Sequence, residues 1–126
     1  MLIKVLVENN SLSDELGSEH GLSIYLEARG QKILFDVGAS GLFFENAKKM
    51  GVDIASVDLL AISHGHYDHG GGLGKFLKEN ERAPVFIHRQ AFGKYYAARS
   101  GREIAYIGLE QGLGQNERLV FTGDQY

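Results

Sequence analysis

Cysteine is absent from this chain of 126 residues, and so is any large excess of charge of one sign. Without cysteine the chain can form no disulfide and no thiolate metal site, so any metal would be bound by imidazole and carboxylate groups. A net charge of −3 gives no overall electrostatic attraction to nucleic acids or anionic membranes, although it leaves room for a local basic patch. We therefore expect neither nucleic acid nor membrane as a partner.

Long hydrophobic runs are absent as well. The apolar run at residues 2–7 is interrupted by Lys4, has no basic leader and is far too short to span a bilayer. It is typical of a strand rather than a signal peptide, so we expect a cytoplasmic protein. The length, the 44% hydrophobic residues and the 23% charged residues predict one ordinary globular domain over residues 1–126.

Strand and helix patterns alternate irregularly along the chain. Apolar alternation over residues 21–28, a turn at Arg29-Gly30-Gln31 and a second run over 32–36 predict a hairpin. The predicted strands are 2–7, 21–28, 32–36, 59–62, 85–88, 105–107 and 119–121, and the predicted helical segments are 42–50, 53–57, 73–80 and 90–98. This mixture favours an α/β fold, a mixed β-sheet with flanking helices, over a purely parallel doubly wound sheet. Helical spacing predicts core or interface positions for Phe43, Phe44, Phe76 and Phe92.

Three of the five histidines and one aspartate lie in the stretch Ser63-His64-Gly65-His66-Tyr67-Asp68-His69, directly after an apolar run. Such a cluster is unfavourable unless something binds it, and a divalent metal satisfies all four groups. If the strand stays extended, His64 and His66 point the same way and can reach one ion. Asp68 and His69 would then reach a second ion, and glycines 70–72 would allow a tight turn and a close approach of substrate.

The spacing His-x-His-x-Asp-His after a hydrophobic strand resembles the signature of the metallo-β-lactamase superfamily. Leu34-Phe35-Asp36-Val37-Gly38 is similar to the aspartate-glycine motif that precedes the metal loop in this family. More narrowly, Glu19-His20-Gly21-Leu22-Ser23 and the histidine stretch resemble one branch. Its members are described as dihydropterin ribofuranosylaminobenzene-phosphate synthase-like proteins or as metal-dependent hydrolases. The resemblance runs over residues 1–126.

This resemblance implies a role for each residue that matches the motif. His64 and His66 would bind a first metal, Asp68 and His69 a second, with Asp68 also catalytic, and Asp36 would steady the metal loop by hydrogen bonds. Zinc is the first expectation for the metal, and manganese and iron accept similar sites. The implied activity is hydrolysis, with metal-bound hydroxide attacking a phosphoester or other ester of a small-molecule substrate. Transfer chemistry in pterin biosynthesis is an alternative by analogy.

Members of the family are about twice this long and form a four-layer αββα sandwich, of which the chain resembles the N-terminal half. The second half supplies further metal ligands, so the set in this chain is incomplete and enzymatic activity stays open. The chain could be a truncated product, half of a split enzyme, or one of two copies that pair. A non-catalytic half-domain that assembles with a partner is the alternative function. In each case we expect an exposed apolar sheet face and association through it.

Two further histidines and one basic segment are weaker candidates. His20 could contact substrate or be an ordinary surface histidine, and His88 at a strand end could line the rim of the site, although a structural role is preferred. A basic and aromatic segment after residue 93 could hold a phosphate or an aromatic ring. The preferred alternative for it is the solvated cationic face of an amphipathic helix. Its members are Lys94, Tyr95, Tyr96, Arg99 and Arg102.

Overall fold

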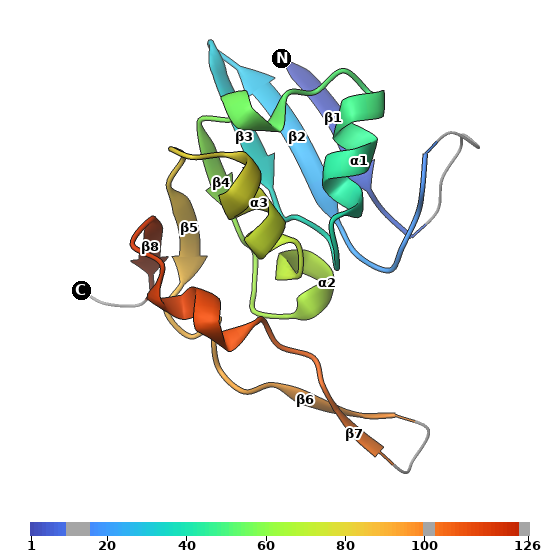
Figure 1. Cartoon of the computed structure of the whole chain (residues 1–126), viewed down its shortest axis with the longest axis vertical. Helices are drawn as coiled ribbons and strands as arrows, with labels where there is room; N and C mark the ends of the chain where they lie inside the picture. The colour runs from blue at the N-terminus through green and yellow to red at the C-terminus, as the bar shows by residue number, and fades with distance from the viewer. Residues whose placement is uncertain (10–15, 100–102, 124–126) are drawn as a thin grey trace.

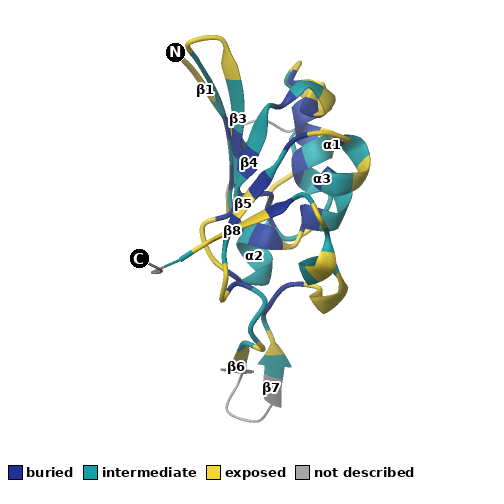
Figure 2. Ribbon diagram, turned by 90° about the vertical axis from the view of Figure 1, so that its left-hand side faces the viewer, coloured by how far each residue is buried: buried dark blue, intermediate teal, exposed yellow. Residues whose placement is uncertain are grey.

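The computed structural model describes residues 1–9, 16–99 and 103–123. A six-stranded sheet forms the body, with its helices on one face and a two-stranded hairpin projecting from one end (Figures 1 and 2). In spatial order the sheet contains β1 (Leu2–Val7), β2 (Ser23–Ala28), β3 (Gln31–Phe35), β4 (Leu59–Ala61), β5 (Val85–His88) and β8 (Leu119–Thr122). The hairpin consists of β6 (Tyr96–Arg99) and β7 (Glu103–Tyr106). The helical segments are α1 (Leu42–Lys49), η1 (Ile54–Ser56), α2 (Tyr67–Gly70), α3 (Leu73–Glu79) and η2 (Gln111–Gln115).

The first three strands pair antiparallel, whereas β3, β4, β5 and β8 are parallel. This arrangement confirms the predicted mixed α/β fold. The carboxyl ends of parallel strands meet at one edge of a sheet, which is where open α/β sheets place their binding sites. Asp36 follows β3, the histidine stretch follows β4 and His88 ends β5, so strand direction brings all three to the same edge.

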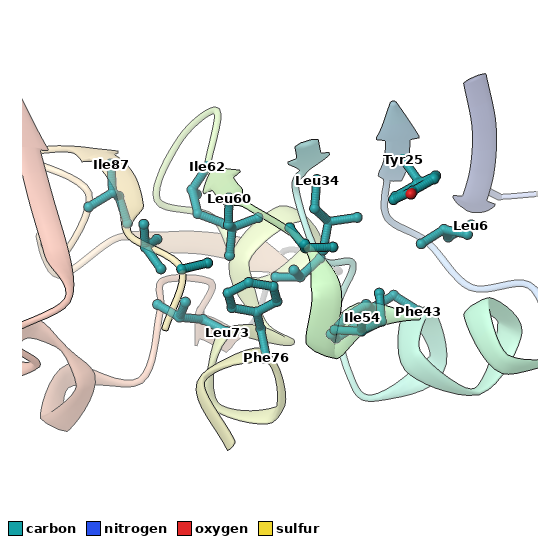
Figure 3. Close-up of a cluster of buried hydrophobic side chains, with 14 of the residues drawn as sticks. Leu6, Tyr25, Leu34, Phe43, Ile54, Leu60, Ile62, Leu73, Phe76 and Ile87 are labelled. Carbon is teal, nitrogen blue, oxygen red and sulfur yellow. The ribbon is translucent and has the colours of Figure 1, made fainter. Parts of the chain in front are cut away.

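The hydrophobic core lies between the sheet and its helices (Figure 3). Leu34, Leu60 and Ile87 come from neighbouring strands, Phe43 comes from α1 and Phe76 from α3, and all five side chains are buried. Strand alternation accounts for the sheet side of this core, since every second residue faces the helices. The predicted aromatic positions lie here: Phe43 and Phe76 are fully buried, and Phe44 and Phe92 pack against the core from its rim.

The opposite face of the sheet carries two rows of apolar side chains. Each row is continuous across the strands, because residues that pair in register lie on the same face. No residue of either row belongs to the buried core, and Ile3 is 57% exposed. Helices α1, α2 and α3 lie on the other face of the sheet, the face that forms the core (Figure 2). We call these rows the open sheet face. They are Ile3, Leu26, Ile33 and Leu59, and Val5, Ile24, Phe35, Ala61, Phe86 and Val120.

The predicted helix over residues 90–98 is wrong. Turns at Ala91 and Gly93, whose N–H groups bond to the His88 and Gln90 carbonyls, lead instead into strand β6. There Tyr96 pairs with Tyr106, with their rings 5.5 Å apart. Cross-strand aromatic pairing outweighs a weak local helical preference. Helix α2 and the turn η2 also form where no helix was predicted, and no described helix is long and apolar enough to cross a bilayer.

Candidate metal centre

The histidine stretch connects β4 to α2 at the carboxyl edge of the sheet. His66 caps the beginning of α2 in an extended conformation, and its carbonyl accepts the N–H groups of His69 and Gly70 at 3.1 and 3.0 Å. Helix α2 thus turns Asp68 and His69 back toward His64. A single helical turn, rather than the predicted glycine loop, brings these groups together.

His64, Asp68 and His69 form the tightest donor group among the described residues. One ligand atom from each lies within 4.8 Å of the other two. His66 lies beside this group, with its ring 4.8 Å from that of His64, but it contributes no atom to it. The structure therefore brings His64 together with Asp68 and His69, and the ring of His66 lies beside that of His64.

The buried carboxylate of Asp36 connects β3 to the histidine stretch. Its Oδ1 accepts the backbone N–H of Ser63 at 2.6 Å. Its Oδ2 accepts the Ser63 hydroxyl at 2.6 Å and faces Nδ1 of His69 at 2.7 Å. The Asp36 backbone has a φ of +59°, a left-handed conformation that is unfavourable for a residue other than glycine by about 1 kcal/mol. These bonds hold that conformation in place.

Counting hydrogens along this network assigns the tautomers of two imidazoles. An ionised carboxylate only accepts hydrogen bonds, so His69 must carry its proton on Nδ1. The single hydroxyl hydrogen of Ser63 is already donated to Asp36. The Ser63 oxygen, 2.8 Å from Nδ1 of His64, can then only accept, so His64 is also protonated on Nδ1. In its neutral form, each of these imidazoles therefore has its lone pair on Nε2.

The pKa of His64 lies below its ordinary value. Burial is the main cause, and repulsion from the imidazoles of His69 and His66 adds to it, while the carboxylates of Asp36 and Asp68 act in the opposite direction. A lowered pKa keeps His64 neutral at neutral pH. Neutral imidazole is the form that binds a metal.

Glycines in this stretch are required by close packing against backbone. A Cβ on Gly65 would collide with the carbonyl of Ala91, and one on Gly71 would collide with the carbonyls of Ala39 and Tyr67. Sequence reasoning assigned glycines 70–72 to a tight turn and substrate approach. The structure shows that Gly71 instead lets the histidine stretch lie directly on the loop after β3.

His20 and His88, the two remaining histidines, lie in different surroundings. His20 places Nε2 3.1 Å from Oδ2 of Asp68. It also lines a pocket of about 180 Å³ together with His66, Tyr67, Asp68, Ala97 and Ile107. His88 is not part of that lining, and its Nδ1 accepts the N–H of Gln90 at 3.0 Å in the turn after β5.

The basic and aromatic segment divides between two locations. The ring of Tyr95 lies 5.7 Å from that of His66, and its hydroxyl donates to the Gln90 carbonyl. Tyr96 is 56% exposed on the hairpin, Arg102 lies outside the described residues, and the side chain of Arg99 is not described. The sequence pattern named Tyr95 as a possible substrate contact but favoured a solvated helical face for its segment, whereas the structure places its ring beside His66. The sequence pattern did not predict that Ser63 connects Asp36 to His64, although its position directly before His64 could have indicated this role.

Residues 16–109 match the family description "Metallo-beta-lactamase superfamily". The chain belongs to the metallo-β-lactamase superfamily. It is 32% identical over 112 residues to an uncharacterized protein of Methanocaldococcus jannaschii, MJ0448, and covers 41% of that protein. It is 37% identical over 87 residues to the 7,8-dihydropterin-6-methyl-4-(β-D-ribofuranosyl)-aminobenzene-5'-phosphate synthase of the same organism, where 64% of this chain covers 29% of the synthase.

The fold is also similar to that of Tm1679, a metal-dependent hydrolase of the β-lactamase superfamily. The TM-score to its crystal structure is 0.72 at 31% identity, and the match covers 97% of this chain and 42% of Tm1679. The chain thus spans less than half the length of these relatives. The expected superfamily, the synthase-like branch and the fold are confirmed.

The donor group suits a metal of this metal-dependent superfamily. Two imidazoles and one carboxylate are ligands that zinc, manganese and iron all accept. Each imidazole uses its other nitrogen for a hydrogen bond, the usual arrangement around metal-binding histidines. The residues present therefore fit a divalent metal.

Replacing Ser63 tests the assigned tautomers in the metal-free protein. We expect Ser63→Ala to release Nδ1 of His64 and to populate the Nε2-protonated form, while His69 stays protonated on Nδ1 through Asp36. Ser63→Thr keeps the hydroxyl and serves as the matched control. ¹H–¹⁵N spectra of the imidazole rings report both residues, and an unchanged His64 in Ser63→Ala would contradict the assignment.

Proposed function

We propose that this chain carries the metal centre of a hydrolase that cleaves phosphoesters or related esters of small molecules. His64, Asp68 and His69 would hold the metal, with His66 as a further ligand beside them. Support comes from one observation above all: one possible ligand atom from each residue lies within 4.8 Å of the other two, and both imidazoles of the group are hydrogen-bonded through Nδ1. Zinc is the first choice, and manganese or iron would fit the same ligands.

A bound divalent metal would supply a Lewis acid and activate water at neutral pH. In a two-metal site, His64 and His66 would serve the first ion and Asp68 and His69 the second. Asp68 would also be catalytic, because its carboxylate is 16% exposed, enough to face a reacting group and exchange a proton with it. Asp36 would steady both histidines through the bonds described above. The pocket beside Asp68 would admit the reacting end of the substrate.

The synthase relative supports a second candidate, a transferase step in pterin biosynthesis. The name of that relative describes the synthesis of a phosphorylated pterin precursor, and it is 37% identical to this chain over 87 residues. A third candidate is a non-catalytic half-domain, because the chain spans only 41% of one curated relative. Phosphodiester cleavage separates the first candidate from the other two.

The open sheet face supports a proposal about assembly. Its two rows contain no charged residue, so nothing on them would repel an identical face. Exposed apolar area of this kind is typical of association surfaces. We therefore propose that a second copy of this chain covers the open sheet face, with a separate partner chain supplying a second half as the alternative. In either assembly, the second chain could supply the metal ligands that the second half of family members provides.

Hydrolysis of bis(4-nitrophenyl) phosphate tests the proposed activity on the full chain loaded with zinc, manganese or iron. We expect Asp68→Asn and His66→Ala each to lower kcat/KM about 100-fold or more, because they remove groups that bind metal or move a proton. His88→Ala, outside the pocket, is the control and should retain activity. A metal-loaded wild-type chain without activity would favour the non-catalytic or transferase candidate.

Light scattering after size-exclusion chromatography tests the assembly. The wild-type chain should have twice the mass of one copy, and Phe86→Glu on the open sheet face should return it to a single copy. Tyr96→Glu on the hairpin is the control, since Tyr96 is exposed but lies on a different sheet. If the wild-type chain has the mass of a single copy, the proposal that a second copy covers the open sheet face is wrong, and a separate partner chain is favoured.

A further inference from the structure

The segment before β2 is fixed against the histidine stretch by its backbone. The Leu22 N–H donates to the carbonyl of Asp68 at 3.1 Å, and Gly38 N–H donates to the Leu22 carbonyl at 2.8 Å. Gly21 has a φ of +156° and approaches the Asp68 carbonyl so closely that a Cβ there would collide with it. The carboxylate of Glu19 accepts the N–H of Ala39 and the hydroxyl of Ser40.

These contacts place the imidazole of His20 directly over the side chain of Asp68. Nε2 of His20 lies 3.1 Å from Oδ2 of Asp68, and Nε2 of His69 lies 3.7 Å from the same oxygen. Because an ionised carboxylate only accepts, the His20 nitrogen must donate. One oxygen of Asp68 therefore accepts a hydrogen bond from His20, which lies outside the donor group, and lies beside Nε2 of His69, which belongs to it.

The hydrogen bond from the His20 side chain to Asp68 can be removed without the backbone bond from Leu22 to Asp68. The side chain of His20 is 68% exposed, so removing it deletes little packing, whereas Asp68 is 16% exposed. The backbone bond from Leu22 to Asp68 does not depend on the identity of residue 20. A substitution at His20 can therefore remove the hydrogen bond to Asp68 and leave the fold of both segments in place.

We propose that His20 is a positioning residue for Asp68. Its N–H fixes the rotation of the Asp68 carboxylate, so that the lone pairs of that group point toward the metal beside His69. This inference rests on the proposed function, because it assumes that Asp68 binds the metal. Hydrogen bonds of this kind to ligating carboxylates typically change metal affinity 10–100-fold.

Competition titration with zinc tests the proposal on the full chain. We expect His20→Ala to weaken zinc binding about 10–100-fold. His20→Gln should recover most of the affinity, because the glutamine amide can donate from about the same position as Nε2. His88→Ala is the matched control and should bind as the wild type does. Thermal unfolding of the metal-free variants should match the wild type, since the backbone bonds remain.

Each outcome separates this proposal from the proposed function. If the wild type binds zinc and His20→Ala binds it equally well, the positioning role fails while the metal centre stands. If His20→Gln binds as weakly as His20→Ala, His20 acts as a ligand and not through Asp68, which also overturns the proposal. If the wild type binds no zinc, the proposed function fails and this inference fails with it.

Discussion

The buried carboxylate of Asp36 is the group on which the site depends. It accepts a backbone N–H and a hydroxyl from Ser63 and an imidazole N–H from His69, and so joins the ends of β3 and β4 to α2. A fully buried carboxylate is unfavourable unless its oxygens are satisfied, and here three donors satisfy them. The same bonds orient His69 directly and His64 through Ser63. One group therefore stabilises the loop and orients two imidazoles of the donor group.

Strand direction and close backbone packing make this network possible. Parallel pairing of β3 with β4 places Asp36 and Ser63 side by side at the carboxyl edge. Gly65 and Gly71 then allow the histidine stretch to touch the carbonyls of neighbouring loops. The hairpin is attached to the same stretch, since the N–H of Tyr67 donates to the carbonyl of Ile107 at 2.8 Å. The walls of the pocket are thus fixed by the segments that hold the donor group.

Much of the fold could be predicted from periodicity, because strands such as β2 and β5 and helix α3 bury one face in a regular pattern. The segment 90–98 could not, because the pairing of Tyr96 with Tyr106 depends on a partner ten residues away. In the site, the likeness to a family pointed to His64, Asp68, His69 and Asp36, and the structure places these residues in contact or in one donor group. Which imidazole nitrogen faces inward and which residue meets Asp68 follow only from three-dimensional contacts.

The central claim is that the Asp36 network presents Nε2 of His64 and His69 to a metal. Zinc titration of the ¹⁵N-labelled full chain, followed through the imidazole ¹H–¹⁵N signals, measures this most directly. The account predicts that the Nε2 signals of both histidines shift on zinc addition, while their Nδ1 atoms keep their protons. Unchanged Nε2 signals, or loss of the Nδ1 protons, would contradict it.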